Sequence, residues 1–367
     1  MTHPRILVTA AAGHTGAAVV RQLLEAGVPV RAAVRRADAR SEALRRLGAE
    51  VVVGDLADAD DVRRSLDGVR RAYYCAPFSP DALGASVLFA AAAEDARLEA
   101  VTVLTQWLAD PASPSPMTRA HWLADRAFAA SSVPTVTVNP GWFADNYRLA
   151  GLDVVARTGV FALPLGDGLN APPSNEDIAR VVVGTLVAPD RHAGQTYRPT
   201  GPRLLSPPEI AEAFGRALGR PVRYVDGPRT FFAKAGRASG LSDYTVAQLF
   251  TYLEEYRRGT FGIGAPTDAV REVGGRAPED VDTIARRYVA DEANVMRGAR
   301  GALRTAGLVA RALRTRRLDP AAYHRRLGVP PPPHTRFAGE SAEWRAGHDR
   351  KAAGEPPARL DPVARAG

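Results

Sequence analysis

The sequence predicts an α/β protein whose larger part is a doubly wound parallel sheet. Over residues 1–141, short apolar runs rich in β-forming residues alternate with amphipathic helical patterns. Strands that alternate with helices form parallel sheets with right-handed crossovers. Over residues 142–290 glycine, proline and helical patterns dominate, which indicates a smaller, mostly helical substrate region. Residues 291–367 form a basic helical extension.

The first element reads as a strand, a tight turn and a helix. The apolar run Ile6–Thr9 is followed by small residues and then by a helical pattern through Val19 and Leu23. Gly13 and Gly16 lack side chains, so backbone N–H groups there can approach a pyrophosphate at the positive end of the helix. An ordinary βα turn without a ligand is the alternative. The residues expected to contact a dinucleotide here are Thr9, Ala10, Gly13, His14, Thr15 and Gly16.

The second strand, at residues 30–34, ends in Arg35-Arg36. In a Rossmann-type unit this strand end meets the adenosine ribose, where an acidic residue selects NAD. An arginine instead pairs with a 2′-phosphate and stacks on adenine. We therefore expect Arg35 to select NADP(H); two solvated loop arginines are the alternative.

The third strand, at residues 50–53, leads into Gly54-Asp55-Leu56 after a helix at 41–47. Backbone and carboxylate groups at this strand end commonly lie beside the adenine, so we expect Asp55 and Leu56 to contact the cofactor. Asp55 can also serve as the N-cap of the helix that starts near Asp58.

Three further strands are predicted at residues 69–75, 100–105 and 135–139, with helices at 82–96 and 119–130. Ligands of such sheets bind beyond the carboxyl ends of the strands. One crevice is therefore expected along the strand ends at Ala10, Arg35, Asp55, Ala76, Thr105 and Pro140, with Ala76, Pro77 and Pro140 contacting the cofactor.

The substrate region begins with a glycine- and proline-rich loop at 163–173, which we expect to shape a pocket. A helix capped by Ser174 or Asn175 follows, and Ser206 and Glu209 have the spacing of a capping box. Short strands are expected at 195–199 and 222–225. Further helices are expected at 210–218, 230–238, 242–258 and 278–290.

Composition excludes several classes of protein. The hydrophobic content of 46% and charged content of 24% are ordinary for a soluble globular chain. Cys75 is the single cysteine, so we expect neither disulfides nor a cysteine-based metal site. A first strand beginning by Arg5 leaves no room for a signal peptide, and the apolar stretch at 85–93 is too short to span a bilayer. We expect a cytoplasmic protein without a metal.

The net charge of +8 belongs to the extension, because residues 292–367 hold 15 Arg or Lys against 7 Asp or Glu. The remainder is neutral and carries no general nucleic-acid signature. An apolar stripe from Met296 to Leu313 predicts a helix, and from Pro330 onward we expect loose docking or disorder. The basic helix could touch a membrane or an acidic partner, but packing on its own domain or in a homodimer is favoured.

Residues 1–290 resemble the NmrA-like family of atypical short-chain dehydrogenases/reductases. The resemblance rests on the turn 9–16, Arg35, the strand end 54–56, and the segments 105–108 and 139–146. The first glycine of the family's Gly-x-x-Gly-x-x-Gly turn is Ala10 here. The family's segment after strand six is matched by Asn139-Pro140-Gly141-Trp142-Phe143-Ala144-Asp145-Asn146.

The resemblance also places the catalytic groups. Counting back from Pro140, the lysine of the usual Tyr-x-x-x-Lys pair falls on His121 and the tyrosine on Met117, so the pair is absent. His121 titrates near neutrality and is our candidate proton donor or ribose ligand, with Thr105 as a nearby hydroxyl. A structural histidine is the alternative. The expected substrate contacts are Trp107, Trp142, Phe143 and Asn146.

Together these features predict an NADPH-dependent reductase of a small, flat carbonyl, quinone or enone compound. The alternative is a non-catalytic NADP(H)-binding sensor that acts through a protein partner.

Overall fold

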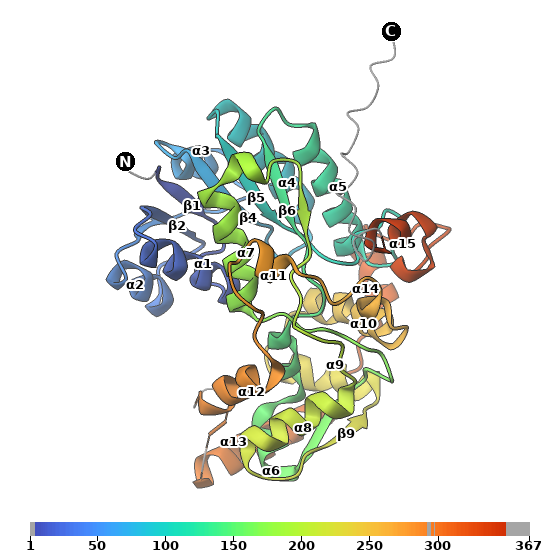
Figure 1. Ribbon diagram of the computed structural model, residues 1–367. Coiled ribbons are helices and arrows are strands. Elements are labelled where there is room, and N and C mark those ends of the chain that lie inside the picture. Colours follow the sequence, from blue (N-terminus) through green and yellow to red (C-terminus); the bar gives the residue numbers. More distant parts are fainter. Residues whose placement is uncertain (1–3, 292–294, 297, 350–367) are drawn as a thin grey trace.

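The computed structural model describes residues 4–291, 295–296 and 298–349 and confirms the doubly wound parallel sheet, which has seven strands (Figure 1). The strand order is β3-β2-β1-β4-β5-β6-β8, and every neighbouring pair is parallel. The strands are β1 (Ile6–Val8), β2 (Val30–Val34), β3 (Glu50–Val53), β4 (Arg71–Cys75), β5 (Ala100–Leu104), β6 (Thr135–Val138) and β8 (Thr196–Tyr197).

Helices cover both faces of this sheet because its central strands are apolar on both sides. One face packs against α1 (His14–Glu25), α2 (Ala39–Arg46) and α7 (Asn175–Val187). The other packs against α3 (Ala59–Leu66), α4 (Ala82–Asp95) and α5 (Pro116–Ala130). The strand order reverses between β1 and β4, so the chain leaves these two strands in opposite directions and opens a crevice at their carboxyl ends.

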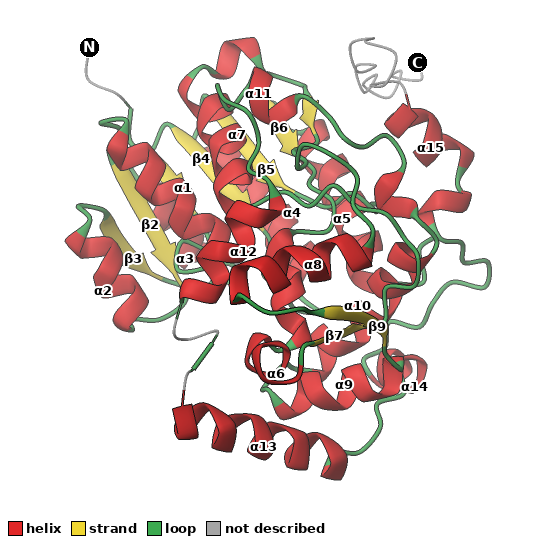
Figure 2. Ribbon diagram, turned by 60° about the horizontal axis from the view of Figure 1, so that its bottom comes forward, coloured by secondary structure: helices red, strands yellow, loops and turns green. Residues whose placement is uncertain are grey.

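A second body lies below the sheet in Figures 1 and 2 and has its own two-stranded parallel sheet. The loop expected at 163–173 is preceded by a helix and a strand that the sequence analysis missed. The elements here are α6 (Leu152–Thr158), β7 (Val160–Leu163), α8 (Pro207–Leu218), β9 (Arg223–Asp226), α9 (Arg229–Ala238), α10 (Asp243–Arg257) and α12 (Val281–Ala290). The short helix α11 (Ala269–Glu272) packs instead on α7, beside the main sheet. The boundaries drawn at 141 and 290 stay predictions. Two elements that follow residue 141 belong to the sheet domain: α7 covers one face of the main sheet, and β8 is its edge strand.

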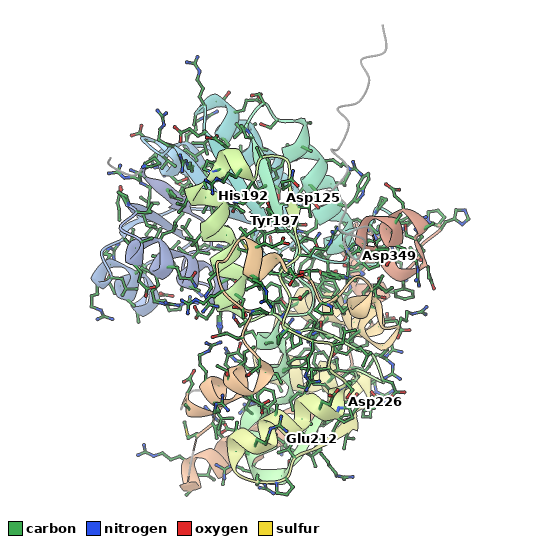
Figure 3. All side chains as sticks on the ribbon, viewed as in Figure 1. Asp125, His192, Tyr197, Glu212, Asp226 and Asp349 are labelled. Atoms are coloured by element: carbon green, nitrogen blue, oxygen red, sulfur yellow. The ribbon has the colours of Figure 1, made fainter. Side chains whose placement is uncertain are left out.

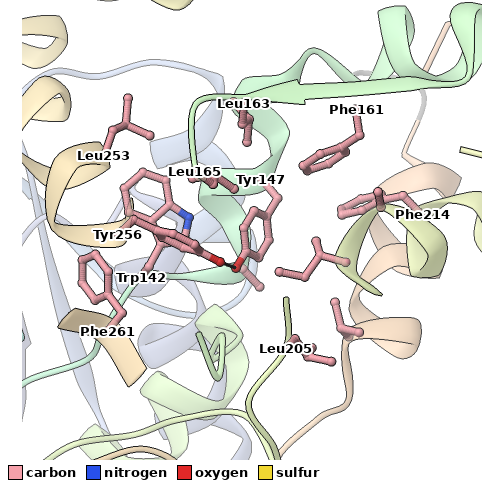
Figure 4. Packing of buried hydrophobic residues seen from close by; sticks show 14 of the residues in the cluster. Trp142, Tyr147, Phe161, Leu163, Leu165, Leu205, Phe214, Leu253, Tyr256 and Phe261 are labelled. Atoms are coloured by element: carbon pink, nitrogen blue, oxygen red, sulfur yellow. Dashed lines mark hydrogen bonds between the residues drawn. The ribbon is translucent and has the colours of Figure 1, made fainter. Parts of the chain in front are cut away.

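A buried aromatic core fills the junction between the two bodies (Figure 4). The hydroxyls of Tyr147 and Tyr256 lie 3.0 Å apart, and Asn170 Nδ2 donates to Tyr147 Oη and to the Trp142 carbonyl, both at 2.9 Å. These bonds satisfy polar atoms that would otherwise be costly to bury.

The basic extension packs on its own chain. The helix α13 (Gly298–Arg314) lies along α9 and α6, where Arg304 pairs with Asp153 (Figure 2). Two further helices follow, α14 (Pro320–Arg326) and α15 (Ala342–Asp349). No helix in the described ranges is long and apolar enough to cross a bilayer.

The expectation of loose docking after Pro330 is wrong for residues 338–349, whereas residues 330–336 lie mostly exposed outside any helix or strand. Trp344 is 6% exposed, its Nε1 donates to the Trp107 carbonyl at 2.9 Å, and its ring stacks on His348 with centroids 3.7 Å apart. A single tryptophan in a polar stretch gives no periodic signal, which is why the sequence pattern concealed this contact. Residues 350–367 lie outside the described part.

We expect Trp344→Ala to lower the free energy of unfolding by about 3–5 kcal/mol, because it removes a buried aromatic ring from the core. Leu313→Ala on α13 is the control, since Leu313 is 66% exposed, and it should change stability by less than about 0.5 kcal/mol. Denaturant unfolding of both variants measures the difference. Equal stabilities would show that α15 contributes nothing to the core.

Candidate active site

The turn between β1 and α1 is shaped by a close backbone approach. The Gly13 N–H donates to the Ala10 carbonyl at 2.9 Å, and a Cβ on Gly16 would lie 2.3 Å from the same oxygen. Gly16 therefore cannot carry a side chain without displacing the turn. Ala10 has φ +48°, a left-handed conformation that costs a non-glycine residue roughly 1–2 kcal/mol. This explains why glycine is usual at the position that Ala10 occupies.

The threonines of the turn bind other elements. Thr9 is buried and its Oγ1 accepts from the Cys75 N–H at 2.9 Å, while Thr15 donates to Asn175 Oδ1 at 2.7 Å. Thr9 thus joins β1 to the end of β4, and Thr15 joins α1 to α7. Anion binding at this turn then falls to the unpaired backbone N–H groups in the first turn of α1.

A cation that the sequence analysis missed lies beside this helix start. Arg148 Nη1 is 3.1 Å from His14 Nδ1 and 2.8 Å from Asp145 Oδ1. His14 is more than half exposed. Arg148 comes from the segment after β6, so only the fold brings its charge to the turn, where the Asp145 carboxylate pairs with it.

The end of β3 borders a cavity of about 240 Å³ lined by Ala33, Gly54, Asp55 and Leu56. Asp55 does not cap α3; Asp58 does, accepting from the N–H groups of residues 60 and 61. Arg35 reaches across the strand ends, with Nη2 3.6 Å from Asp55 Oδ2, and its side chain is 81% exposed. The predicted adenosine contacts therefore lie together, and Arg35, although paired with Asp55, is exposed to a phosphate that binds there.

A second cavity, of about 370 Å³, lies at the carboxyl ends of β4, β5 and β6. Its walls are mostly apolar and we call it the substrate cavity. It brings together the predicted residues Ala76, Thr105, Trp107, His121, Pro140, Trp142, Phe143 and Asn146. Trp107 and Trp142 are 1% and 2% exposed, so they form its wall rather than a free surface, and Pro77 is not among the lining residues.

The polar edge of the substrate cavity differs from the sequence prediction. Burial lowers the pKa of His121 to about 4, so its imidazole is neutral at pH 7. The expectation that it titrates near neutrality is therefore wrong. Neutral imidazole still offers one N–H to a bound oxygen, but it is a poor proton source.

Asp125 supplies an acid that the sequence analysis missed (Figure 3). Thr105 Oγ1, at the cavity wall, is 3.1 Å from Asp125 Oδ2. Burial raises the pKa of Asp125 to about 7, against the lowering effects of the Thr105 hydrogen bond and of the charges on Arg126 and Arg198. A carboxyl group that holds a proton near neutral pH is thus connected to the cavity by one hydroxyl. Its position four residues after His121 on α5 is the only sequence signal.

Comparison with known proteins places this geometry in a family. A sequence model of NAD(P)H-binding domains matches residues 10–189. An NAD(P)H azoreductase from Xenophilus azovorans is 32% identical over 280 residues, which cover 75% of this chain and 88% of that protein. The chain belongs to the NmrA-like family of atypical short-chain dehydrogenases/reductases.

Solved structures confirm the fold of this NmrA-like chain. An NADPH-dependent quinone oxidoreductase from Escherichia coli, crystallised with NADPH, superposes with a TM-score of 0.67 at 22% identity, covering 77% of this chain and 99% of that one. NmrA, a negative transcriptional regulator in complex with NAD, gives a TM-score of 0.67 at 19% identity, covering 80% and 98%.

The NmrA-like chain lacks the usual catalytic tyrosine but has another phenol in the cavity. Met117, at the tyrosine position, is 1% exposed and its sulfur is 3.6 Å from the Tyr244 hydroxyl. Tyr252 of α10 lines the same cavity; burial raises its pKa to about 12, against hydrogen bonds with Thr118 and Gln106. The phenol therefore keeps its proton at neutral pH. It lies on a helix more than a hundred residues away, beyond the reach of a local motif.

We expect Gly16→Ala to weaken NAD(P)H binding at least tenfold, because its Cβ would displace the Ala10 carbonyl and with it the N–H groups that face the anion. Gly84→Ala in α4 is the matched control, since a Cβ there meets no atom within 4 Å. Calorimetric titration of both variants gives the affinities. Equal binding would show that the turn does not hold the nucleotide.

Proposed function

We propose that this chain reduces a small, flat quinone, carbonyl or enone compound with NADPH. The 32% identical NAD(P)H azoreductase supports an NAD(P)H-dependent oxidoreductase; the choice of NADPH and the substrate class are the proposal. The observation that supports it best is the apolar substrate cavity, which has the hydroxyls of Thr105 and Tyr252 and the imidazole of His121 on its wall. An aromatic-walled cavity with a few convergent polar groups suits a flat conjugated substrate.

The choice of NADPH rests on charge at the adenosine end. Arg35 is an exposed cation at the end of β2, next to the exposed Arg36, and its partner Asp55 is 3.6 Å away and half exposed. A 2′-phosphate would offer the guanidinium a stronger, charge-assisted partner than this loose ion pair.

The reduction of a carbonyl or quinone needs a hydride and a proton. A bound reduced nicotinamide supplies the hydride. We assign the proton to Asp125. In the structure Thr105 Oγ1 donates to Asp125 Oδ2 at 3.1 Å; when the carboxyl is protonated the direction of this bond reverses, so that Asp125 passes its proton to Thr105 Oγ1 while Thr105 gives its own to the substrate oxygen. The resulting carboxylate is stabilised by the charge of Arg198. Tyr252 and neutral His121 hold the same oxygen by hydrogen bonds, and the apolar walls keep water out.

The sensor alternative has one observation in its favour: the family's tyrosine position holds the buried Met117. Stopped-flow absorbance of NADPH, with a panel of quinones and enones, separates the two functions. Tight NADPH binding without oxidation across the panel would favour the sensor. Oxidation that depends on a quinone or enone supports the reductase.

We expect Arg35→Glu to raise the Kd for NADPH at least tenfold, about 1.4 kcal/mol, and to leave the Kd for NADH within about threefold. Arg63→Glu on α3 is the control, because Arg63 is an exposed cation paired with Asp60. Calorimetry measures both affinities. Equal weakening of NADPH and NADH would show that Arg35 does not contact the 2′-phosphate.

We expect Thr105→Val to lower kcat by about 10²–10⁴-fold, because it breaks the path of the proton. The wild-type rate should be highest below pH 7 and fall above it, since Asp125, with a pKa of about 7, loses its proton there. Thr102→Val in β5, just before Thr105, is the control, because the Thr102 hydroxyl binds Thr185 and not Asp125. A variant with wild-type rate and pH profile would exclude the proposed proton path.

A further inference from the structure

Another apolar cavity, of about 450 Å³, adjoins the substrate cavity. Leu149 and Leu241 line both, so the two spaces meet at these side chains. We call the second space the side cavity. It lies between β7, α6, α9 and α13, in the lower body of Figure 2.

The walls of the side cavity are built for an apolar occupant. Val160 and Ala162 come from β7, Phe232 and Ala235 from α9, and Leu308, Val309 and Ala312 from α13. Arg148, at the cofactor turn, is the one charged side chain among its described lining residues. Apolar atoms that enter such a space leave water without losing hydrogen bonds.

The basic extension forms one wall of this cavity, and polar contacts at its edges hold it there. Arg304 pairs with Asp153, Lys234 Nζ donates to the Leu313 carbonyl at 3.3 Å, and Arg237 Nη1 donates to the Arg316 carbonyl at 2.6 Å. These contacts anchor α13 by its margins and leave Leu308, Val309 and Ala312 facing the cavity. Leu303 and Leu313 of the stripe predicted from the sequence are instead 74% and 66% exposed. The E. coli quinone oxidoreductase covers only 77% of this chain.

We propose that the side cavity binds the apolar side chain of an amphipathic substrate, a quinone or enone that carries an alkyl or isoprenoid tail. The inference rests on the proposed function, because the flat head would occupy the substrate cavity. The tail would pass between Leu149 and Leu241 and lie under Leu308. Each methylene group that becomes buried should tighten binding about fourfold.

Calorimetric titration with benzoquinones that carry methyl, pentyl or decyl chains tests this in the protein with NADP⁺ bound. We expect the Kd to fall at least a hundredfold from methyl to decyl in the wild type. Ala235→Phe, which fills the side cavity, should remove at least nine-tenths of that gain. Ala302→Phe, on the exposed side of α13, should keep it. An affinity independent of chain length, or an equal gain in both variants, would overturn the proposal.

Two further measurements keep the outcomes distinct. NADPH oxidation is followed separately. Binding that tightens with alkyl length but gives no NADPH oxidation contradicts the reductase and leaves the side cavity standing. NADPH oxidation with an affinity independent of alkyl length contradicts the side cavity and leaves the reductase standing. If Ala235→Phe loses cooperative unfolding, Ala162→Leu fills the same space from β7. A full chain-length gain in Ala162→Leu would also overturn the proposal.

Discussion

The burial of tryptophans at the carboxyl ends of β5 and β6 is the constraint on which the rest of the structure depends. Trp107 and Trp142 follow directly on these strands, and both are almost fully buried. Tyr256 and Phe261 of the second body pack edge-on against Trp142, and Trp344 of the extension binds the Trp107 backbone. Aromatic rings of this size bury 150–250 Å² each, so they dominate the energy of the junction. The substrate cavity is the space left beside them.

This arrangement separates two electrostatic environments. The cofactor end is exposed and charged, with Arg35 beside Asp55 and Arg148 beside His14. The substrate end is apolar, and there burial moves the pKa of His121 down and that of Asp125 up. Desolvation therefore keeps the His121 imidazole uncharged and keeps a proton on the Asp125 carboxyl near pH 7, although the two residues are only about one turn apart on α5. The charged end suits the phosphates of a cofactor, and the apolar end suits an uncharged flat substrate.

Local patterns predicted most of the fold and the cofactor end of the site. Local sequence alone defines the turn at Gly13 and Gly16, the strand end at Arg35 and the capping box at Ser206. These features can therefore be predicted without knowledge of tertiary contacts. Arg148, Asp125 and Tyr252 were missed because their roles arise only where distant segments meet. The same reason hid the docking of Trp344 and the shifted pKa of His121. Burial is a property of the assembled core, and no window of sequence reports it.

The clustering of tryptophans has a spectroscopic consequence. Of the four in the chain, Trp107, Trp142 and Trp344 lie in or against one core, and only Trp122 lies elsewhere, on α5 beneath Arg126. Intrinsic fluorescence therefore reports mainly on the junction and is nearly blind to β1, β2 and β3. Far-ultraviolet circular dichroism reports on all helices. Unfolding curves that coincide by both signals would show that the nucleotide-binding half and the junction melt as one cooperative unit.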